Sequence, residues 1–275
     1  LAQPDLFLHF PMSAMIQSTV SALPKFHRVT PLLPNKAGNI FFKMEFMQPS
    51  GSFKDRGIGN MITELMSQHT VRKLICSSGG NAGLAVATAA KKVNLPVDVY
   101  VPTSTKELMV SKLRSTGANV IVHGVNWNAA DGLAKEALAK EEDAYYIPPY
   151  DDPMIWEGNA SLVDELAAEG VKPGAIVLSV GGGGLLCGVQ RGLLRNGWED
   201  VRIIAVETEG AASFAAAQKA GRPVRLDAIT SIATSLGALA VTEGTLATKD
   251  SIVTESMVVS DKDAVRAMRR FADEE

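Results

Sequence analysis

The sequence predicts an α/β protein of two doubly wound domains, each built around a parallel sheet. Short runs of β-branched and apolar residues alternate with segments of helical spacing, which is the pattern of βαβ units. Because the runs are continuously apolar, their strands are expected to be covered by helices on both faces. A proline-rich stretch at 145–153 separates two groups of runs and predicts a crossing between domains.

The expected elements follow one another in chain order. Residues 104–117 are predicted to form a helix from a Ser/Thr cap to Gly117, and residues 156–170 a helix that ends on Gly170. Another helical pattern starts near Ser260. The strand runs, each followed by a loop and a helical pattern, are 73–78, 97–102, 119–124, 175–180 and 202–207.

The composition limits the classes of partner. The chain has 275 residues, 46% of them apolar, and a net charge of −3 without a basic cluster. This argues against nucleic acid and anionic membrane as main partners. No apolar run approaches the roughly 18 residues of a membrane span, so the protein is expected to be soluble, with a small molecule as its partner.

Cysteine and histidine usage predicts a reduced compartment and no metal centre of His or Cys. Cys76 and Cys187 each lie in an apolar segment, where a buried thiol is the simplest interpretation. The four histidines show no metal-ligand spacing. A cytoplasmic location is therefore expected.

The two ends and the domain limits are also predicted. The sequence opens at Leu1 without methionine and stops inside a helical pattern, so the natural chain is expected to extend at one or both ends. The large domain is predicted to comprise residues 1–43 and 155–275, with the small domain inserted at 44–154. Residues 1–27 match no motif and are a candidate docking arm.

The first of three candidate loops places a lysine at a helix entrance. Residues 50–57 read SGSFKDRG, and a helical pattern follows them. Ser52 is a candidate cap, and Lys54 falls where the helix dipole is positive, which costs a solvated surface lysine only about 0.3 kcal/mol. The functional interpretation is that the site lowers the pKa of Lys54, so that the neutral amine attacks an aldehyde.

The second loop, residues 77–83, reads SSGGNAG between a strand run and a helical pattern. In open α/β sheets ligands bind at the carboxyl ends of strands, where the free N–H groups of the next helix accept an anion. A structural alternative is that Ser78 and Asn81 only cap the helix. The adjacent glycines favour a bound carboxylate, because capping needs no close approach of the backbone.

The third loop carries four consecutive glycines, 181–184, again between a strand run and a helical pattern. Such a run is entropically expensive, which makes a purely structural explanation unattractive and favours a backbone nest for phosphate. The loop fits neither G-x-x-x-x-G-K-[ST] nor G-x-G-x-x-G. A reactive lysine, a carboxylate site and a phosphate nest together indicate pyridoxal 5′-phosphate acting on an amino acid.

A family resemblance runs through almost the whole chain from about Thr30. The segments that carry it are PSGSFKDRGIGN, SSGGNAGLAVATAA, PPYDDPMIWEGNASLVDE, LSVGGGGLLCGV, VETEGAASF and TSIATSLGA. In this order they resemble the fold-type II pyridoxal-phosphate enzymes, and among these the eukaryotic-type L-serine dehydratases and L-threonine deaminases. The resemblance implies a tryptophan synthase β-like fold, with the cofactor in the cleft between the two domains, and a homodimer.

The resemblance also implies a role for each matched residue. Lys54 would bind the cofactor covalently, Phe53 would stack on its pyridine ring, and Asn81 would hydrogen-bond its 3′-oxygen. Ser78, Gly79 and Asn81 would bind the substrate carboxylate. The phosphate would be held by Gly181, Gly182, Gly183 and Gly184. A monovalent cation such as K⁺ would be held at Gly181, Glu207, Ala211, Ser213, Leu236 and Ala238. Glu207 has the alternative interpretation of a strand-end acid with a structural role.

The implied reaction converts L-serine to pyruvate and ammonia, or L-threonine to 2-oxobutyrate and ammonia, in amino-acid catabolism and gluconeogenesis. The freed amine of Lys54 would take the Cα proton while the β-hydroxyl leaves. The side chain that faces the pyridine nitrogen in this family is expected beyond Glu275. Because such dehydratases vary at the positions of Gly79 and Ser235, the preference between the two substrates stays open.

Two kinds of alternative remain. A β-replacement synthase, a threonine synthase or a serine racemase would use the same lysine and glycine loops, although the segments WEGNAS and TSIATSLG favour the dehydratase. A protein that binds pyridoxal phosphate without catalysis is the alternative of a different class.

Overall fold

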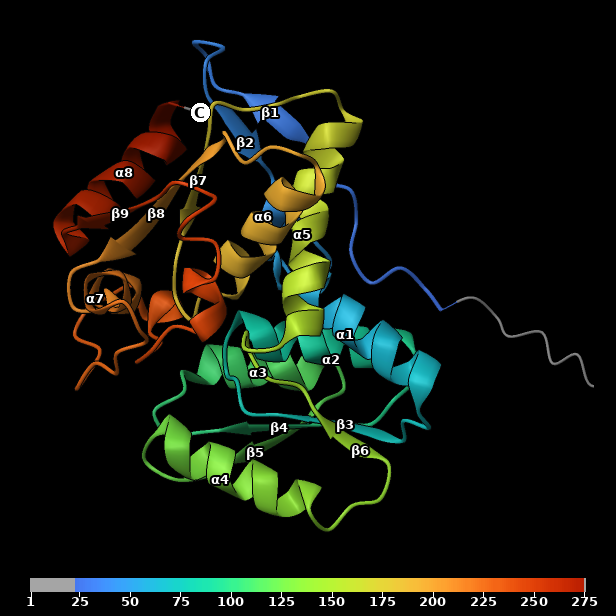
Figure 1. The fold of residues 1–275 in the computed structure, drawn as a ribbon. Coiled ribbons are helices and arrows are strands. Elements are labelled where there is room, and N and C mark those ends of the chain that lie inside the picture. The colour runs from blue at the N-terminus through green and yellow to red at the C-terminus, as the bar shows by residue number, and fades with distance from the viewer. Residues whose placement is uncertain (1–22, 275) are drawn as a thin grey trace, which may run out of the picture.

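The computed structural model describes residues 23–274, which fold around two parallel sheets (Figure 1). The strands are β1 (Leu32–Pro34), β2 (Phe41–Lys43), β3 (Lys73–Cys76), β4 (Val97–Val101), β5 (Asn119–Val122), β6 (Ala144–Tyr146), β7 (Ala175–Ser179), β8 (Arg202–Thr208) and β9 (Thr254–Val259). The helices are α1 (Lys54–Gln68), α2 (Asn81–Lys92), α3 (Glu107–Ser115), α4 (Trp127–Leu138), α5 (Pro153–Ala168), α6 (Gly184–Arg195), α7 (Ser213–Ala220) and α8 (Asp261–Glu274).

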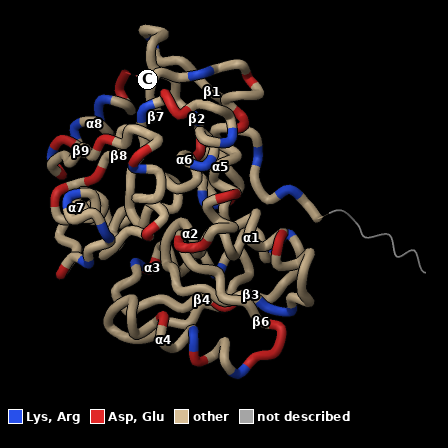
Figure 2. The backbone as a smooth tube through the Cα atoms, in the orientation of Figure 1, with Lys and Arg blue, Asp and Glu red and all other residues tan. Residues whose placement is uncertain are grey.

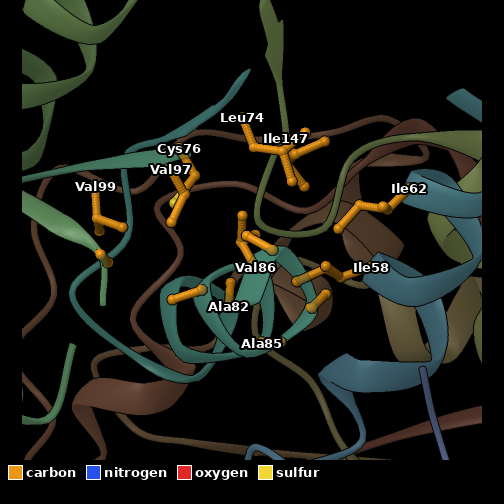
Figure 3. Packing of buried hydrophobic residues seen from close by; sticks show 14 of the residues in the cluster. Ile58, Ile62, Leu74, Cys76, Ala82, Ala85, Val86, Val97, Val99 and Ile147 are labelled. Atoms are coloured by element: carbon orange, nitrogen blue, oxygen red, sulfur yellow. The ribbon is translucent and has the colours of Figure 1, made fainter. Parts of the chain in front are cut away.

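The first sheet has the order β5-β4-β3-β6, with all neighbours parallel. Helices α1, α2 and α3 lie over one face and α4 lies over the other (Figure 1). Side chains alternate along β3: Leu74 joins the core of the α1–α2 face, whereas Ile75 joins Ala130 of α4. Figure 3 shows the first of these cores, where Val86 of α2 packs near Ile58 of α1.

The second sheet has the order β7-β8-β9 and is also parallel. Its core is formed by buried residues of β8, α6 and α7, among them Ile203, Leu193 and Phe214. Both sheets are therefore of the parallel α/β type that the alternating sequence pattern predicts. The expected cover on both faces is incomplete in the second sheet within residues 23–274, because Val177 on β7 is 65% exposed and Met257 on β9 is 48% exposed.

Helix α5 belongs to both cores. Ile155 in its first turn packs in the core of the first sheet, and Val163 two turns later packs in the core of the second. The expected domain boundary between residues 154 and 155 falls inside this helix, and the boundary after residue 43 falls at the end of β2. The division into 1–43 plus 155–275 and 44–154 stays a prediction.

The five predicted strands are present, each in a slightly different range, whereas several start signals were wrong. Helix α3 begins at Glu107, with Lys106 at its N-cap and no side-chain cap, so the predicted Ser/Thr cap is absent. Helix α5 begins earlier than predicted, at Pro153, and the Asp152 side chain caps it by accepting from the N–H of Met154. Gly117 and Gly170 have φ values of +96° and +72°, which only glycine adopts readily, and they end their helices as predicted.

The described part of the candidate docking arm lies on α1. Phe26 is buried, and its Cβ fills the space that a side chain at Gly59 would need, at 2.4 Å from the Cβ position there. Gln48 exchanges two hydrogen bonds with the backbone of Arg28. Residues 1–22 of the predicted arm lie outside the described residues.

Charged residues are spread over both halves of the molecule. Figure 2 shows Lys and Arg interspersed with Asp and Glu around both sheets. Within residues 23–274, none of the helices combines the length and the apolar character needed to cross a lipid bilayer.

Candidate active site

Lys54 is the first residue of α1 and is partly buried. Its Nζ donates to the carbonyl oxygen of Pro149 at 2.6 Å and lies 5.2 Å from the centre of the Phe53 ring. Burial away from water disfavours the ammonium form and lowers the pKa of Lys54 to about 8. The predicted lowering of this pKa is confirmed. The predicted cap is wrong, because Phe53 is the N-cap residue and the Ser52 hydroxyl is buried without a hydrogen-bond partner.

Helix α1 is held in place two residues beyond Lys54. Arg56 is completely buried, and its guanidinium donates to Glu45 at 2.7 Å and to Glu165 at 2.6 Å. Glu165 lies on α5, where Gly158 approaches the backbone of α1 so closely that a Cβ there would be 2.3 Å from the carbonyl oxygen of Arg56. Paired charges and close backbone packing therefore fix the helix that carries Lys54.

The glycine loop 181–184 joins β7 to α6. Within the described residues, the backbone N–H groups of this loop make no hydrogen bond to another protein atom. Four donors at the start of a helix are the arrangement that binds phosphate. The Asn159 side chain of α5 donates to the carbonyl oxygen of Gly184 at 3.0 Å and so holds the loop from the side of α5.

Packing supplies a second reason for these glycines, although a purely structural explanation was not expected from the sequence. A Cβ would lie 2.4 Å from the Tyr150 ring at Gly182, and 2.7 Å from the Tyr150 carbonyl oxygen at Gly184. Gly183 has a φ of +91°, and a Cβ there would lie 2.3 Å from Thr245. The structural interpretation therefore accounts for these glycines as well, and phosphate binding by the loop stays a prediction.

Pro149 and Tyr150 connect the lysine to the glycine loop. Pro149 accepts from Lys54, and the next residue, Tyr150, packs its ring on Gly182. This role was not predicted, since the segment was interpreted as a crossing between domains and as part of the family resemblance. Two consecutive prolines, Pro148 and Pro149, were the available signal, because they fix the local backbone.

The loop 77–81 follows β3, and Pro149 and Tyr150 follow the neighbouring strand β6. Carboxyl ends of adjacent parallel strands meet at one edge of the sheet, so this loop lies on the same side as Lys54. Neither Ser78 nor Asn81 caps α2, because Gly80 is the N-cap and has no side chain. Within residues 23–274 the exposed Asn81 side chain makes no hydrogen bond, and the one hydrogen bond of the Ser78 hydroxyl is accepted from the N–H of Gly80 at 3.3 Å.

Two of the positions expected to hold a cation, Ser213 and Leu236, contact Gly181 of the glycine loop. Ser213 donates to the carbonyl oxygen of Gly181 at 3.4 Å, and a Cβ at Gly181 would lie 3.3 Å from Leu236. Ala211 is buried, and Ala238 donates to the Leu236 carbonyl oxygen. No cluster of three His, Cys, Asp or Glu side chains suited to a metal ion occurs in the described residues.

The Glu207 carboxylate accepts hydrogen bonds from two backbone N–H groups. Its two carboxylate oxygens accept from the N–H groups of Phe214 at 2.7 Å and Ala215 at 2.8 Å, in the first turn of α7. Burial raises the pKa of Glu207, and the two backbone hydrogen bonds oppose that shift. The carboxylate thus fits the alternative role of capping a helix.

The residues present fit pyridoxal 5′-phosphate by their donor chemistry. The glycine loop offers unpaired N–H donors for a phosphate, and Lys54 offers an amine of lowered pKa for an aldehyde. Phe53 lies beside this amine, and the 78–81 loop supplies the Asn81 side chain, unpaired within the described residues, at the same edge of the first sheet.

Comparisons with known proteins agree with this chemistry. The family model for pyridoxal-phosphate dependent enzymes matches residues 23–275. The chain is 47% identical over 271 residues to a mouse protein named serine dehydratase-like, covering 96% of this chain and 82% of that protein. It is also 47% identical over 264 residues to the mouse L-serine dehydratase/L-threonine deaminase, covering 93% and 80%. The crystal structure of a fungal L-serine ammonia-lyase from Rhizomucor miehei matches with a TM-score of 0.84 at 36% identity, covering 90% and 81%.

Proposed function

Because the chain belongs to the family of pyridoxal-phosphate dependent enzymes, we propose that it converts L-serine to pyruvate and ammonia, and L-threonine to 2-oxobutyrate and ammonia. The names of the relatives support this choice of substrates. The observation that carries the proposal is the chain of contacts from the Lys54 amine through Pro149 and Tyr150 to Gly182. These contacts bring a low-pKa amine to a loop with unpaired N–H donors.

Each predicted site residue has a place in this proposal. Lys54 would hold the cofactor covalently through Nζ, and Phe53 and Asn81 would contact its ring. The backbone N–H groups of Gly181, Gly182, Gly183 and Gly184 would bind its phosphate. Ser78, Gly79 and Asn81 bind the substrate carboxylate. Hydrogen bonds to charged groups contribute roughly 1.5–3 kcal/mol each, so these loops orient the cofactor and the substrate strongly.

The proposed chemistry assigns the proton transfer to Lys54. When bound, pyridoxal phosphate supplies the ring that stabilises negative charge at the substrate Cα. The neutral Nζ of Lys54 would take the Cα proton, and the β-hydroxyl would leave as water with the proton that the Lys54 ammonium gives back. Hydrolysis of the released enamine consumes one water and frees ammonia, so L-serine yields pyruvate and ammonia in balance. An amine with a pKa of about 8 is suited to accept and return a proton near neutral pH.

The domain division is part of the proposal. Residues 1–43 and 155–275 form the large domain, residues 44–154 form the small one, and the cofactor lies between them. Closure of the small domain over the substrate excludes water from the charged Cα. The membership of α5 in both cores supports transmission of such a movement to the glycine loop, because Asn159 on α5 bonds Gly184.

Three further features complete the proposal. A monovalent cation such as K⁺ binds at Gly181, Glu207, Ala211, Ser213, Leu236 and Ala238, so exchange of KCl for tetramethylammonium chloride lowers activity. The enzyme is a homodimer, which light scattering tests by mass. It resides in the cytoplasm, a location that its two buried free cysteines support and that cell fractionation tests.

The test is pyruvate release from L-serine by the protein supplied with pyridoxal 5′-phosphate, with Lys54→Ala assayed in parallel. Wild type is expected to release pyruvate, and Lys54→Ala none, because the variant lacks both the covalent attachment and the base. Lys91→Ala is the matched control, since Lys91 is exposed at the end of α2. Borohydride reduction followed by peptide mass spectrometry should locate the cofactor on Lys54.

The outcomes separate the alternatives. Pyruvate from wild type and from Lys91→Ala, but not from Lys54→Ala, supports the dehydratase. D-serine from L-serine would indicate a racemase, and activity that requires sulfide or a phosphorylated substrate would indicate a synthase. A cofactor bound at Lys54 without any turnover would indicate a protein that binds pyridoxal phosphate without catalysis.

A further inference from the structure

Ser77 is held by side chains from two elements that the proposed function does not use. It directly precedes the 78–81 loop and is 1% exposed. Its hydroxyl donates to Asp131 at 2.7 Å and lies 2.6 Å from the hydroxyl of Tyr146. Its carbonyl oxygen accepts from the indole N–H of Trp127 at 2.6 Å. We call Ser77, Trp127, Asp131 and Tyr146 the Ser77 anchor.

The Ser77 anchor is a connected network rather than a set of single contacts. Tyr146 on β6 donates to Asp131 on α4 at 2.6 Å, and Lys135 pairs with the other oxygen of Asp131 at 2.7 Å. Burial acts to raise the pKa of Asp131, but hydrogen bonds from Lys135, Tyr146 and Ser77 outweigh it and hold the pKa below its ordinary value. A buried carboxylate with these partners is ionised and rigidly placed.

The loop that follows depends on this anchor for its position. Within the described residues, neither the Ser78 nor the Asn81 side chain hydrogen-bonds to another element, and Gly80 and Asn81 are exposed. The other end of the loop is the first turn of α2. Among hydrogen bonds to other elements, those of Ser77 therefore fix the start of this loop. Close packing limits it further, because a Cβ at Gly79 would lie 2.8 Å from Thr105 and the Ser78 carbonyl oxygen packs on Gly83.

We propose that the Ser77 anchor positions the 78–81 loop for the substrate carboxylate, so that Trp127 and Tyr146 are positioning residues for substrate affinity. This proposal rests on the proposed function, since it concerns the loop assigned to the carboxylate. A carboxylate accepts short, directed hydrogen bonds, and a displacement of the donors by about 1 Å removes much of their energy. Side chains that never touch the substrate thus control how tightly its carboxylate is held.

The experiment uses the holoenzyme and two single substitutions, Tyr146→Phe and Trp127→Phe. L-alanine is the probe, because it has the amine and carboxylate of the substrate but no leaving group; its affinity is read from the change in cofactor absorbance. L-alaninamide, which lacks the carboxylate, is titrated in parallel. Tyr145→Phe is the matched control, since it removes a hydroxyl one residue away, from a ring stacked on His69 with centres 5.5 Å apart.

Both substitutions are expected to raise the dissociation constant for L-alanine about threefold to tenfold, the effect of losing one hydrogen bond. The KM for L-serine should rise by the same factor, while kcat, the affinity for pyridoxal phosphate and the affinity for L-alaninamide stay unchanged. Tyr145→Phe should behave as wild type.

Three results would overturn the proposal: unchanged L-alanine affinity in Trp127→Phe, equal weakening of L-alaninamide, or the same weakening in Tyr145→Phe. If Tyr146→Phe fails to fold, the same measurements on Trp127→Phe test the proposal, because Trp127 is half-exposed. Wild type that binds L-alanine but makes no pyruvate from L-serine would contradict the proposed function and leave the Ser77 anchor standing as a carboxylate-positioning device.

Discussion

The lowered pKa of Lys54 has a direct consequence for the pH dependence of cofactor uptake. Only the neutral amine attacks an aldehyde, so the uptake rate of the cofactor-free protein should rise with pH and level off above about 8, rather than above the ordinary value of 10.5. Stopped-flow absorbance after mixing with pyridoxal 5′-phosphate measures this rate. Nα-acetyl-lysine amide is the control and should level off near 10.5; the same midpoint for the protein would contradict the prediction.

The same pKa affects stability without the cofactor. The folded-state pKa lies below that of the unfolded chain, so between about 8 and 10.5 the unfolded chain binds more protons. The free energy of unfolding of the cofactor-free protein should therefore rise with pH across this window, after subtraction of the same measurement on Lys54→Met. An equal pH dependence of the unfolding free energy in both proteins, measured by urea titration, would show that Lys54 makes no pH-dependent contribution to stability.

Single residues of the site differ in how far the sequence predicts them. Lys54 and the four glycines are found because a lysine at a helix start and a glycine run are costly unless they serve a purpose. Pro149, Trp127 and Asp131 are not found, because their roles depend on a backbone carbonyl or on contacts across 50 or more positions of sequence. Periodicity and motif spacing carry no information on such contacts.

At the scale of elements, the close contact between the glycine loop and the segment after β6 is testable. Gly182→Ala places a methyl group 2.4 Å from the Tyr150 ring, so the ring and the loop must separate. The affinity for pyridoxal phosphate should fall at least about tenfold, measured by equilibrium dialysis, because shifted N–H groups lose charge-assisted hydrogen bonds of roughly 1.5–3 kcal/mol each. Gly174→Ala is the control, since nothing lies within 4 Å of that position. Unchanged affinity in Gly182→Ala would mean that the loop does not hold the phosphate.

Some strands and helices are predicted from the sequence, and others are not. Apolar runs of four or more residues, such as those of β3 and β8, are predicted because both faces of their strands are buried. The three-residue strands β1, β2 and β6 are too short for a pattern, and β9 carries polar Thr254, Glu255 and Ser256 among its residues. Helix starts were mispredicted where a polar residue suggested a cap but the backbone begins the helix elsewhere.

At the scale of the whole molecule, Arg56 connects three separate segments of the chain. It joins α1 to Glu45 near β2 and to Glu165 on α5, and all of its side chain is buried. Arg56→Met leaves both carboxylates without their main partner, so the free energy of unfolding should fall by about 3–5 kcal/mol in urea titrations. Arg72→Met is the control, because the Arg72 side chain is 74% exposed and its ion pair should contribute less than about 1 kcal/mol. Equal losses in both variants would show that the buried network adds nothing.

The two buried cysteines can report local opening of the structure. Cys76 lies in the core of the first sheet, and Cys187 lies on α6, which packs on the second sheet. Each cysteine is 2% exposed, and burial raises the pKa of both thiols to about 12. At neutral pH neither is a thiolate, so an alkylating dye reacts only while the surrounding structure is transiently open. The labelling rate of Cys76 therefore measures local opening around the first sheet, and that of Cys187 measures local opening around α6. No engineered label is needed for either measurement.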